Sequence, residues 1–508
     1  MEFSLRRSNP RKALALAVAC ALGSAAPSAA LAVASRTALP HSGAAAVRSE
    51  IRSLMPRSPK APSSPAAAFH VTSCADDDGP GTLRTIVAAA GEGDSVDLST
   101  LSCSSITLTQ GAVPVLLNDL TVSGPGAEAL ALDGDGASRV FVHPGYGTLV
   151  VQGLTLRNGA TRVAGNKITG GGCVASLGYV ALDHSSVSGC YASGEGVYGG
   201  GIFAYGVLLY DSSVSGNVAL GKSATFDTAS FGGGIYARYA RIADSTVSAN
   251  RATHTFAYGK SGYDTGGGIF CDGGGTILAS TIEGNYSYRF GGGVSTYGRG
   301  VVDVINSTIS GNSANTKTGG GIHMRVYGTA NIENSTITAN HAAIGGGVYL
   351  RGLTQAFTLQ STVISGNTAA SGGADIGASA PTVLLGANNL VVANGANVTL
   401  PADTLHVDPL LRPLAFNGGA TRTHALRPGS PALDAGNDFA GLATDQRGDG
   451  FPRTVGAGTD IGAFEGVVAT AAGPAQIPTL SNTVLAVLAA VLAAAGGLAM
   501  RRHRRHVT

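Results

Sequence analysis

The chain contains no tryptophan, and charged residues make up only 13% of its 508 residues. Its formal net charge of +2 misleads, because eight of the 33 basic residues stand near the two ends. Without those ends, and without Glu2, 25 basic and 30 acidic residues remain, a net charge of −5. No basic tract suits a phosphate backbone, so we expect no nucleic-acid partner. With 75 glycines and few charges, the chain is expected to gain rigidity from stacked backbone rather than from a globular core.

A run of three glycines followed by Ile, Val or Cys recurs through the middle of the chain. Successive runs begin between 25 and 34 residues apart. A period in this range indicates a solenoid, in which each unit buries its apolar face only against its neighbours. The runs begin at Gly170, Gly199, Gly232, Gly266, Gly291, Gly319 and Gly345.

A second motif follows the runs in phase, for example Asn306-Ser-Thr-Ile-Ser-Gly-Asn312. Its alternation predicts short strands, and the absence of any helical pattern excludes leucine-rich, ankyrin and tetratricopeptide arrays. We therefore predict an all-β parallel β-helix with one coil per repeat. The last Asn of each motif is expected in the left-handed backbone region at a corner, with its amide bonded to the next coil. Three columns should form: inward Val187, Val214, Val247, Ile282, Ile309 and Ile337; polar Ser212, Ser245, Ser280, Ser307 and Ser335; and corner Asn217, Asn250, Asn285, Asn312, Asn340 and Asn367.

The repeats and the segments on either side of them resemble a known group of proteins. The repeats are similar to the right-handed parallel β-helix (pectin-lyase-like) repeats of secreted bacterial surface proteins. Upstream, the segment from Cys74 to Ile86, with Gly-Thr-Leu-Arg-Thr-Ile at its end, resembles the start of such helices, although Val87 departs from the pattern. Downstream, 429–436, 445–448 and 460–465 resemble the terminal module of choice-of-anchor surface proteins. Its charged residues are expected to form turns and ion pairs that close the last coil and cover its open edge. They are Asp434, Asp445, Arg447, Asp460 and Glu465.

The first 32 residues have the layout of a secretory signal peptide. Four basic residues precede an apolar stretch from Ala13 to about Leu22, and small residues lead to a cleavage site after Ala32. A lipoprotein with a lipidated Cys20 is the alternative. Residues 33–70 are rich in Ala, Pro, Ser and Arg without periodicity, which predicts a disordered linker.

The last residues predict a membrane segment. Leu485 to Met500 is nearly all Ala, Leu, Val and Gly, and the arginines from 501 to 505 should hold the end of the chain inside. With the motif before it, this layout resembles IPTL-type C-terminal sorting signals, which exosortase-like enzymes process, although Asn482 and Thr483 depart from the pattern. A plain transmembrane anchor is the alternative. The motif is Ile477, Pro478, Thr479, Leu480 and Ser481.

These features predict the domain organisation and the compartment. The protein should be exported and held at the cell surface or outer membrane, permanently or until the tail is processed. An autotransporter passenger is disfavoured, because the chain ends in one apolar helix and a basic tail. The expected parts are a signal peptide at 1–32, a linker at 33–70, an N-terminal cap with the first coils at 71–139, β-helix repeats at 140–385, an end module at 386–466, a linker at 467–476, and a sorting signal or transmembrane anchor at 477–508.

Five cysteines lie outside the signal peptide. Cys74 and Cys103 flank the expected cap and are the candidate disulfide in an oxidising compartment. Cys173 and Cys190 fall within one coil, and their pairing stays open. Cys271 follows a glycine run at an inward position, where a buried small residue is expected rather than a reactive thiol.

Many β-helices cleave polysaccharides, so a catalytic role is one candidate for this chain. Asp183-His184 echoes a lyase motif, but the repeat itself accounts for the Asp, and no Arg-x-Pro-x-x-Arg follows. Paired-Asp and Gly-His-Gly segments of β-helical glycosidases are also missing. Asp133 and Asp135 favour a turn, with a Ca²⁺ site as the alternative. No other metal or cofactor is expected. We therefore predict no catalytic residues and no enzyme, with a secreted polysaccharide lyase or glycoside hydrolase as the alternative.

The residues after each glycine run suggest a binding face. Aromatic rings beside arginines on a flat ridge suit sugar rings or a protein partner, and ladder stacking for stability is the alternative. We predict an adhesive protein that binds a glycan, or a surface or matrix protein. The first outward column is Phe203, Tyr236, Phe270, Ser295, His323 and Tyr349, and the second is Tyr205, Arg238, Asp272, Tyr297, Arg325 and Arg351.

Overall fold

A computed structural model describes residues 68–164, 168–222, 229–255, 263–352 and 357–466. The expected signal peptide, most of the first linker, the second linker and the sorting signal lie outside the described residues. Within those ranges, no helix is both long and apolar enough to cross a membrane.

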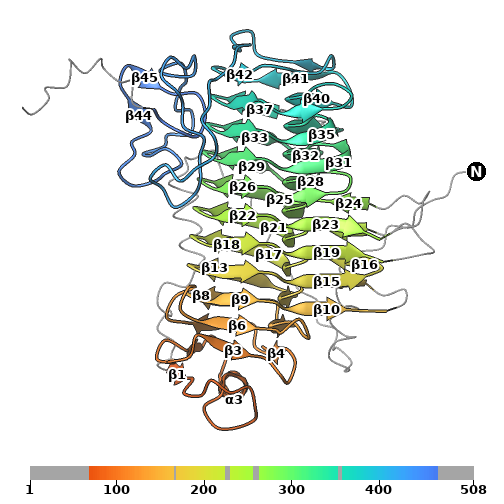
Figure 1. Ribbon diagram of the computed structural model, residues 1–508, viewed down its shortest axis with the longest axis vertical. Helices are drawn as coiled ribbons and strands as arrows, with labels where there is room; N and C mark the ends of the chain where they lie inside the picture. The colour runs from red at the N-terminus through yellow and green to blue at the C-terminus, as the bar shows by residue number, and fades with distance from the viewer. Residues whose placement is uncertain (1–67, 165–167, 223–228, 256–262, 353–356, 467–508) are drawn as a thin grey trace, which may run out of the picture. The chain divides into compact units, whose positions relative to one another are not determined.

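The described chain forms a parallel β-helix, as predicted, with coils stacked in sequence order (Figure 1). Its second sheet has one strand from each of 11 coils. They are β3 (Ser105–Thr107), β6 (Ala131–Asp133), β9 (Thr155–Arg157), β14 (Ser186–Ser188), β18 (Ser213–Ser215), β22 (Thr246–Ser248), β26 (Thr281–Glu283), β30 (Thr308–Ser310), β34 (Thr336–Thr338), β38 (Val363–Ser365) and β42 (Leu390–Val391).

Two smaller sheets, of eight and four strands, follow the second sheet in some of the coils. The third sheet comprises β10 (Ala160–Arg162), β15 (Tyr191–Gly194), β19 (Val218–Gly221), β23 (Arg251–His254), β27 (Tyr286–Ser287), β31 (Ser313–Thr318), β35 (His341–Ile344) and β39 (Thr368–Ala369). The fourth sheet comprises β11 (Ile168–Gly170), β16 (Gly196–Tyr198), β20 (Ala229–Phe231) and β24 (Tyr263–Thr265), which precede four of the glycine runs.

The first sheet begins after each glycine run and has 20 strands. They are β1 (Ala68–His70), β2 (Ser95–Asp97), β4 (Val113–Pro114), β5 (Leu120–Ser123), β7 (Phe141–His143), β8 (Thr148–Gln152), β12 (Val174–Ser176), β13 (Tyr179–Asp183), β17 (Ile202–Tyr210), β21 (Ile235–Ala243), β25 (Ile269–Leu278), β28 (Val294–Gly298), β29 (Val302–Ile305), β32 (Ile322–Val326), β33 (Ala330–Glu333), β36 (Val348–Leu350), β37 (Phe357–Gln360), β40 (Ile376–Ala378), β41 (Thr382–Leu385) and β43 (Val398–Thr399).

The core is the stack of inward side chains from successive coils. All six predicted aliphatic residues of the second sheet, from Val187 to Ile337, are fully buried, which confirms the inward column. The glycine runs let neighbouring coils approach closely. Gly199 has a φ of 73°, and a Cβ atom on Gly200 would lie 2.1 Å from the carbonyl oxygen of Gly233 in the next coil.

The corner asparagines form a continuous ladder. The Oδ1 of Asn312 accepts hydrogen bonds from the backbone N–H and the Nδ2 of Asn285, both at 3.0 Å. Its own Nδ2 donates to the carbonyl of Ile282 and to Oδ1 of Asn340, both at 2.9 Å. The pattern repeats from Asn217 to Asn367, so each buried amide is satisfied by neighbouring coils.

The prediction of a left-handed backbone at these asparagines is wrong. The residue before each of them takes that conformation instead, with φ of 66° at Gly311 and 54° at Ala249. The ladder asparagine itself does not take a positive φ, because its side chain must point into the coil to reach the asparagines of the neighbouring coils.

The predicted serine column is a second ladder. The backbone N–H of Ser280 donates to Oγ of Ser307 at 3.1 Å, and Oγ of Ser280 donates to the carbonyl of Leu278 at 2.7 Å. The ladder begins at Ser185 and continues past Ser335 to Thr362 and Asn389.

The N-terminal cap is tied by an ion pair and a disulfide. A short helix, α3 (Leu83–Ala89), begins after Thr82, which caps it. Arg84 donates to Asp76 at 2.9 Å and to the carbonyl of Gly111 at 2.8 Å. Cys74 and Cys103 are joined by a disulfide, with their Cα atoms 6.3 Å apart. The Leu-Arg segment that resembles a β-helix start therefore has a structural role here.

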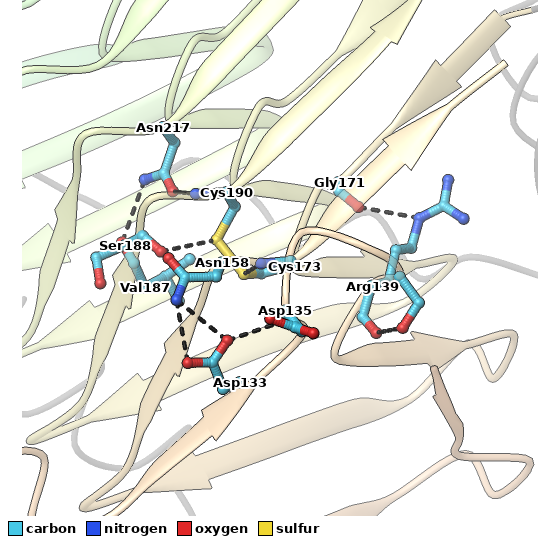
Figure 2. The surroundings of a disulfide bond; sticks show 12 residues. Asp133, Asp135, Arg139, Asn158, Gly171, Cys173, Val187, Ser188, Cys190 and Asn217 are labelled. Carbon is cyan, nitrogen blue, oxygen red and sulfur yellow. Dashed lines mark hydrogen bonds between the residues drawn. A yellow bond between two sulfur atoms is a disulfide. The ribbon is translucent and has the colours of Figure 1, made fainter. Parts of the chain in front are cut away.

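A second disulfide joins Cys173 to Cys190 within one coil (Figure 2). The backbone N–H of Cys190 donates to Oδ1 of Asn217 at 2.9 Å, so the disulfide lies at the N-terminal end of the asparagine ladder. Cys271 is free and buried, as expected, and burial raises the pKa of its thiol to about 12.

The first part of the end module pairs with the last coils, through β42, β43 and Leu405. The expected ion pairs form within the module, between Arg447 and Asp445 at 2.6 Å and between Arg453 and Glu465 at 3.4 Å.

The rest of the module, with the hairpin of β44 (Thr454–Val455) and β45 (Gly458–Thr459), does not lie over the end of the last coil as we expected. It bonds to the outer face of the second sheet, where Thr308 donates to Gln446 and the N–H of Ala463 donates to Thr336. Arg422 also pairs with Glu283 of β26. The reason is that this face presents a row of hydroxyl groups, which supply the module with partners across several coils.

Candidate functional site

The first outward column of aromatic residues is largely buried, which corrects the prediction that it forms part of a binding face. Phe203, Tyr236 and Phe270 are each only 8% exposed. Their rings stack on one another, with centroids 5.3 and 5.5 Å apart. Tyr198 and Phe231, from the fourth sheet across the glycine turn, pack against them. These rings fill a corner of the coil, and ladder stacking accounts for them.

The upper part of the same column is also covered. Ser295 and His323 are buried, and the ring of Tyr349 stacks on that of His323 at 5.8 Å. Burial, with added repulsion from Arg351 and Arg325, lowers the pKa of His323 to about 3. The imidazole is therefore neutral at ordinary pH and belongs to the packing of the corner.

The second outward column is accessible. Tyr297 is 42% exposed, and Arg351 is exposed. Tyr205, Arg238 and Arg325 are half-buried. The structure therefore separates the two predicted columns into a covered one and an open one.

Three tyrosines that the sequence interpretation missed extend the open column. The ring of Tyr205 contacts those of Tyr179 and Tyr239, with centroids 5.7 Å apart in both pairs. Further along the first sheet, the rings of Tyr297 and Tyr327 lie 6.5 Å apart. Tyr239 and Tyr327 are each 38% exposed. We call these five residues the tyrosine strip.

Two arginines stack on the strip. Arg238 lies 5.6 Å from the ring centroid of Tyr239, and its Nε donates to the tyrosine hydroxyl at 3.3 Å. Arg325 lies over the ring of Tyr297 at 4.8 Å. The guanidinium groups are thereby held in place beside exposed aromatic surface.

Glycines make room for the strip's rings. A Cβ atom on Gly206 would lie 2.2 Å from Cε1 of Tyr179, and one on Gly273 would lie 2.9 Å from Cε1 of Tyr239. The rings therefore lie over bare backbone of the following coil. This explains why Gly206 and Gly273 stand where a strand would favour a larger residue.

One carboxyl group, that of Asp272, stands in the coil between Tyr239 and Tyr297. Its Oδ2 accepts a hydrogen bond from the Tyr236 hydroxyl at 3.3 Å, while its Oδ1 is buried without a partner among the described residues. Burial raises the pKa of Asp272, although the charge of Arg238 and the Tyr236 hydrogen bond oppose the shift. Asp272 is therefore the acid near the tyrosine strip whose pKa is shifted.

The residues that echo catalytic or calcium motifs lie elsewhere. His184 stands at the corner after β13, where its Nδ1 lies 2.6 Å from Asp183 and its Nε2 lies 3.2 Å from Asp211. Asp133 accepts a hydrogen bond from Arg157 at 2.7 Å. It also accepts one from the N–H of Asp135 at 2.9 Å, which makes the segment a turn (Figure 2). Across the described ranges, no group of three or more His, Cys, Asp or Glu side chains is placed to hold a metal ion.

Comparison with known proteins gives little beyond the fold. No protein-family model matches the chain, and no curated protein matches it. Among solved structures it is similar to the pectate lyase Pel9A, with a TM-score of 0.44 and 12% sequence identity, covering 79% of this chain and 97% of that one. What the tyrosine strip can bind is therefore inferred from its own residues.

Proposed function

We propose that the tyrosine strip binds carbohydrate. The observation that carries the proposal is the row of five tyrosines along the first sheet, three of them more than a third exposed, in a protein that buries its other aromatic column. Tyrosine offers a large, rigid apolar face together with a hydroxyl group, so little conformational entropy is lost on binding. Sugar rings present both apolar C–H faces and hydroxyl groups to such a surface.

The arginines would fix the orientation of the bound sugar. The guanidinium groups of Arg238 and Arg325 supply planar arrays of donors beside the rings. A chain of sugars lying along the strip would meet one coil every 4.8 Å or so.

The proposed setting is the cell surface. The basic and apolar segment at 1–32 supports export, and the tripartite segment at 477–508 supports retention in the membrane or processing by an exosortase-like enzyme. A glycan-binding body between two such ends would act as an adhesin or as a matrix-binding protein.

A glycan array probed with the full-length protein tests this function. We expect binding to one or more polysaccharides, and loss of the signal in the double variant Tyr239→Ala/Tyr297→Ala. Phe416→Ala is the matched control, because that ring is 72% exposed but lies in the end module. Equal signals from the wild type and the double variant would show that the strip is not the binding site.

A second candidate function, polysaccharide cleavage at the same strip, is favoured by Asp272. A carboxyl group with a raised pKa holds its proton to a higher pH than an ordinary Asp, as a general acid requires. Release of reducing or unsaturated ends from acidic polysaccharides, with loss of turnover in Asp272→Asn, would favour this candidate. Binding without turnover would leave the adhesive role.

A further inference from the structure

The outer surface of the third sheet carries cations from coils that are distant in the sequence. Arg162, Lys222, Arg251 and Lys317 are all exposed and belong to, or directly follow, strands β10, β19, β23 and β31. Parallel pairing places these strands in one sheet. The four residues stand at three different positions along their strands, and we call them the cationic column. Sequence analysis missed it because its members lie between 29 and 66 residues apart.

The third sheet carries little compensating charge. Its eight strands, all of which the structure describes, contain no Asp or Glu, and Glu195, which directly follows β15, stands next to Lys222 of the following coil. This contrasts with the chain as a whole, whose residues between the basic ends carry a net charge of −5. A face rich in cations on a body of net negative charge raises the local concentration of anionic ligands.

Aromatic rings hold three of these cations. Arg162 and Lys222 lie over the ring of Tyr191, at 5.1 and 5.9 Å from its centroid. Arg251 lies over the ring of Tyr286 at 4.2 Å. Stacking limits the side chains' freedom while most of their N–H donors remain available, so an anion would bind at a lower entropic cost.

We propose that the cationic column binds an acidic polysaccharide laid along the axis of the coils. Charge complementarity selects a polyanion, and cations from four of six successive coils would contact it at several points. The column is formed by the third sheet and the tyrosine strip by the first, so this site is independent of the proposed function. It would let the protein bind a carboxylated or sulfated matrix without the strip.

Surface plasmon resonance with the full-length protein, over dextran sulfate, polygalacturonate and neutral dextran, tests the proposal. We expect binding to the two acidic polymers alone, weakened strongly by raising the salt concentration. The double variant Arg251→Glu/Lys317→Glu should bind about tenfold more weakly, because each exposed charge contributes up to about 1 kcal/mol. Arg412→Glu/Arg427→Glu, which makes the same change in net charge on the exposed end module, should bind within about twofold of the wild type.

A milder column variant keeps the test open if charge reversal prevents folding. Arg251→Gln/Lys317→Gln should weaken binding about threefold. Unchanged binding by a folded column variant, equal binding to neutral dextran, or binding to anionic phospholipid vesicles but to neither polymer would overturn the proposal.

Discussion

Cys173 and Cys190 occupy the positions that Gly201 and Asn217 hold one coil later. The N–H of Cys173 donates to the carbonyl of Gly201 at 3.0 Å, and that of Cys190 donates to Oδ1 of Asn217 at 2.9 Å. In the later coil, a Cβ on Gly201 would lie 2.9 Å from the amide carbon of Asn217. The disulfide therefore replaces a glycine–asparagine contact with a covalent bond at the end of the ladder.

This equivalence predicts the outcome of two double variants. Cys173→Gly/Cys190→Asn should extend the asparagine ladder by one coil, whereas Cys173→Ala/Cys190→Ala only removes the disulfide. Both lose the same cross-link, so their difference isolates the ladder. Urea denaturation should show the Gly/Asn variant more stable by about 1–2 kcal/mol, the contribution of one or two buried hydrogen bonds. Equal unfolding free energies would mean that the ladder cannot be extended.

The left-handed corner offers a second matched pair. Ala249, with a φ of 54°, takes the place that Gly311, with a φ of 66°, holds two coils later. Nothing lies closer than 3.8 Å to a Cβ built on Gly311, so a methyl group there fits and only its backbone conformation is strained. We expect Ala249→Gly to stabilise the protein and Gly311→Ala to destabilise it, each by about 1 kcal/mol. Thermal unfolding measures both, and shifts of the same sign would contradict this account.

The fold was predictable because each coil repeats the same short sequence pattern. A glycine run, a Ser-x-Val/Ile strand and a ladder Asn recur in each unit, and their phase alone gives the inward column and both ladders. The left-handed positions were misassigned because Asn tolerates that conformation, yet Gly311 and Ala249 take it here. The end module's position could not be predicted, since contacts such as Gln446 with Thr308 join residues 138 apart.

The end module should make stability depend on pH. Burial, reinforced by the charge of Asp460, raises the pKa of Glu465 from 4.5 to about 7, against opposing hydrogen bonds from Val455 and Asp460 and the charge of Arg453. The folded protein therefore holds this proton more tightly than the unfolded chain. Stability contributed by protonated Glu465 is full below pH 4.5 and is lost as the pH rises through about 7.

Glu465→Gln removes that titration. Between pH 5 and pH 8, the wild type should lose roughly 2 kcal/mol more unfolding free energy than the variant, after allowance for partial solvent screening. Chemical denaturation at both pH values measures the difference. The matched control is Glu92→Gln on the exposed surface of the cap, which should follow the wild type. A Glu465→Gln protein with the wild-type pH profile would show that Glu465 does not titrate in this range.

The candidate site was predictable only in part. Counting outward positions from the glycine runs found Tyr205, Tyr297 and Arg238, but it could not show that the fourth sheet covers Phe203 and its neighbours. It also missed Tyr239, because the alternation breaks within β21, where the neighbouring residues Arg238 and Tyr239 are both accessible. A search for tyrosine followed one coil later by glycine, as in Tyr239 and Gly273, is the signal that would have found it.

Isothermal titration calorimetry tests the central claim, carbohydrate binding by the tyrosine strip, most directly. The oligosaccharide with the strongest array signal is titrated into the wild type, Tyr239→Ala/Tyr297→Ala and the Phe416→Ala control. We expect the double variant to lose at least about 2 kcal/mol of binding free energy, roughly thirtyfold in affinity, since each stacked ring contributes about 1 kcal/mol or more. The control should bind as the wild type does. A folded double variant with unchanged affinity would contradict the account.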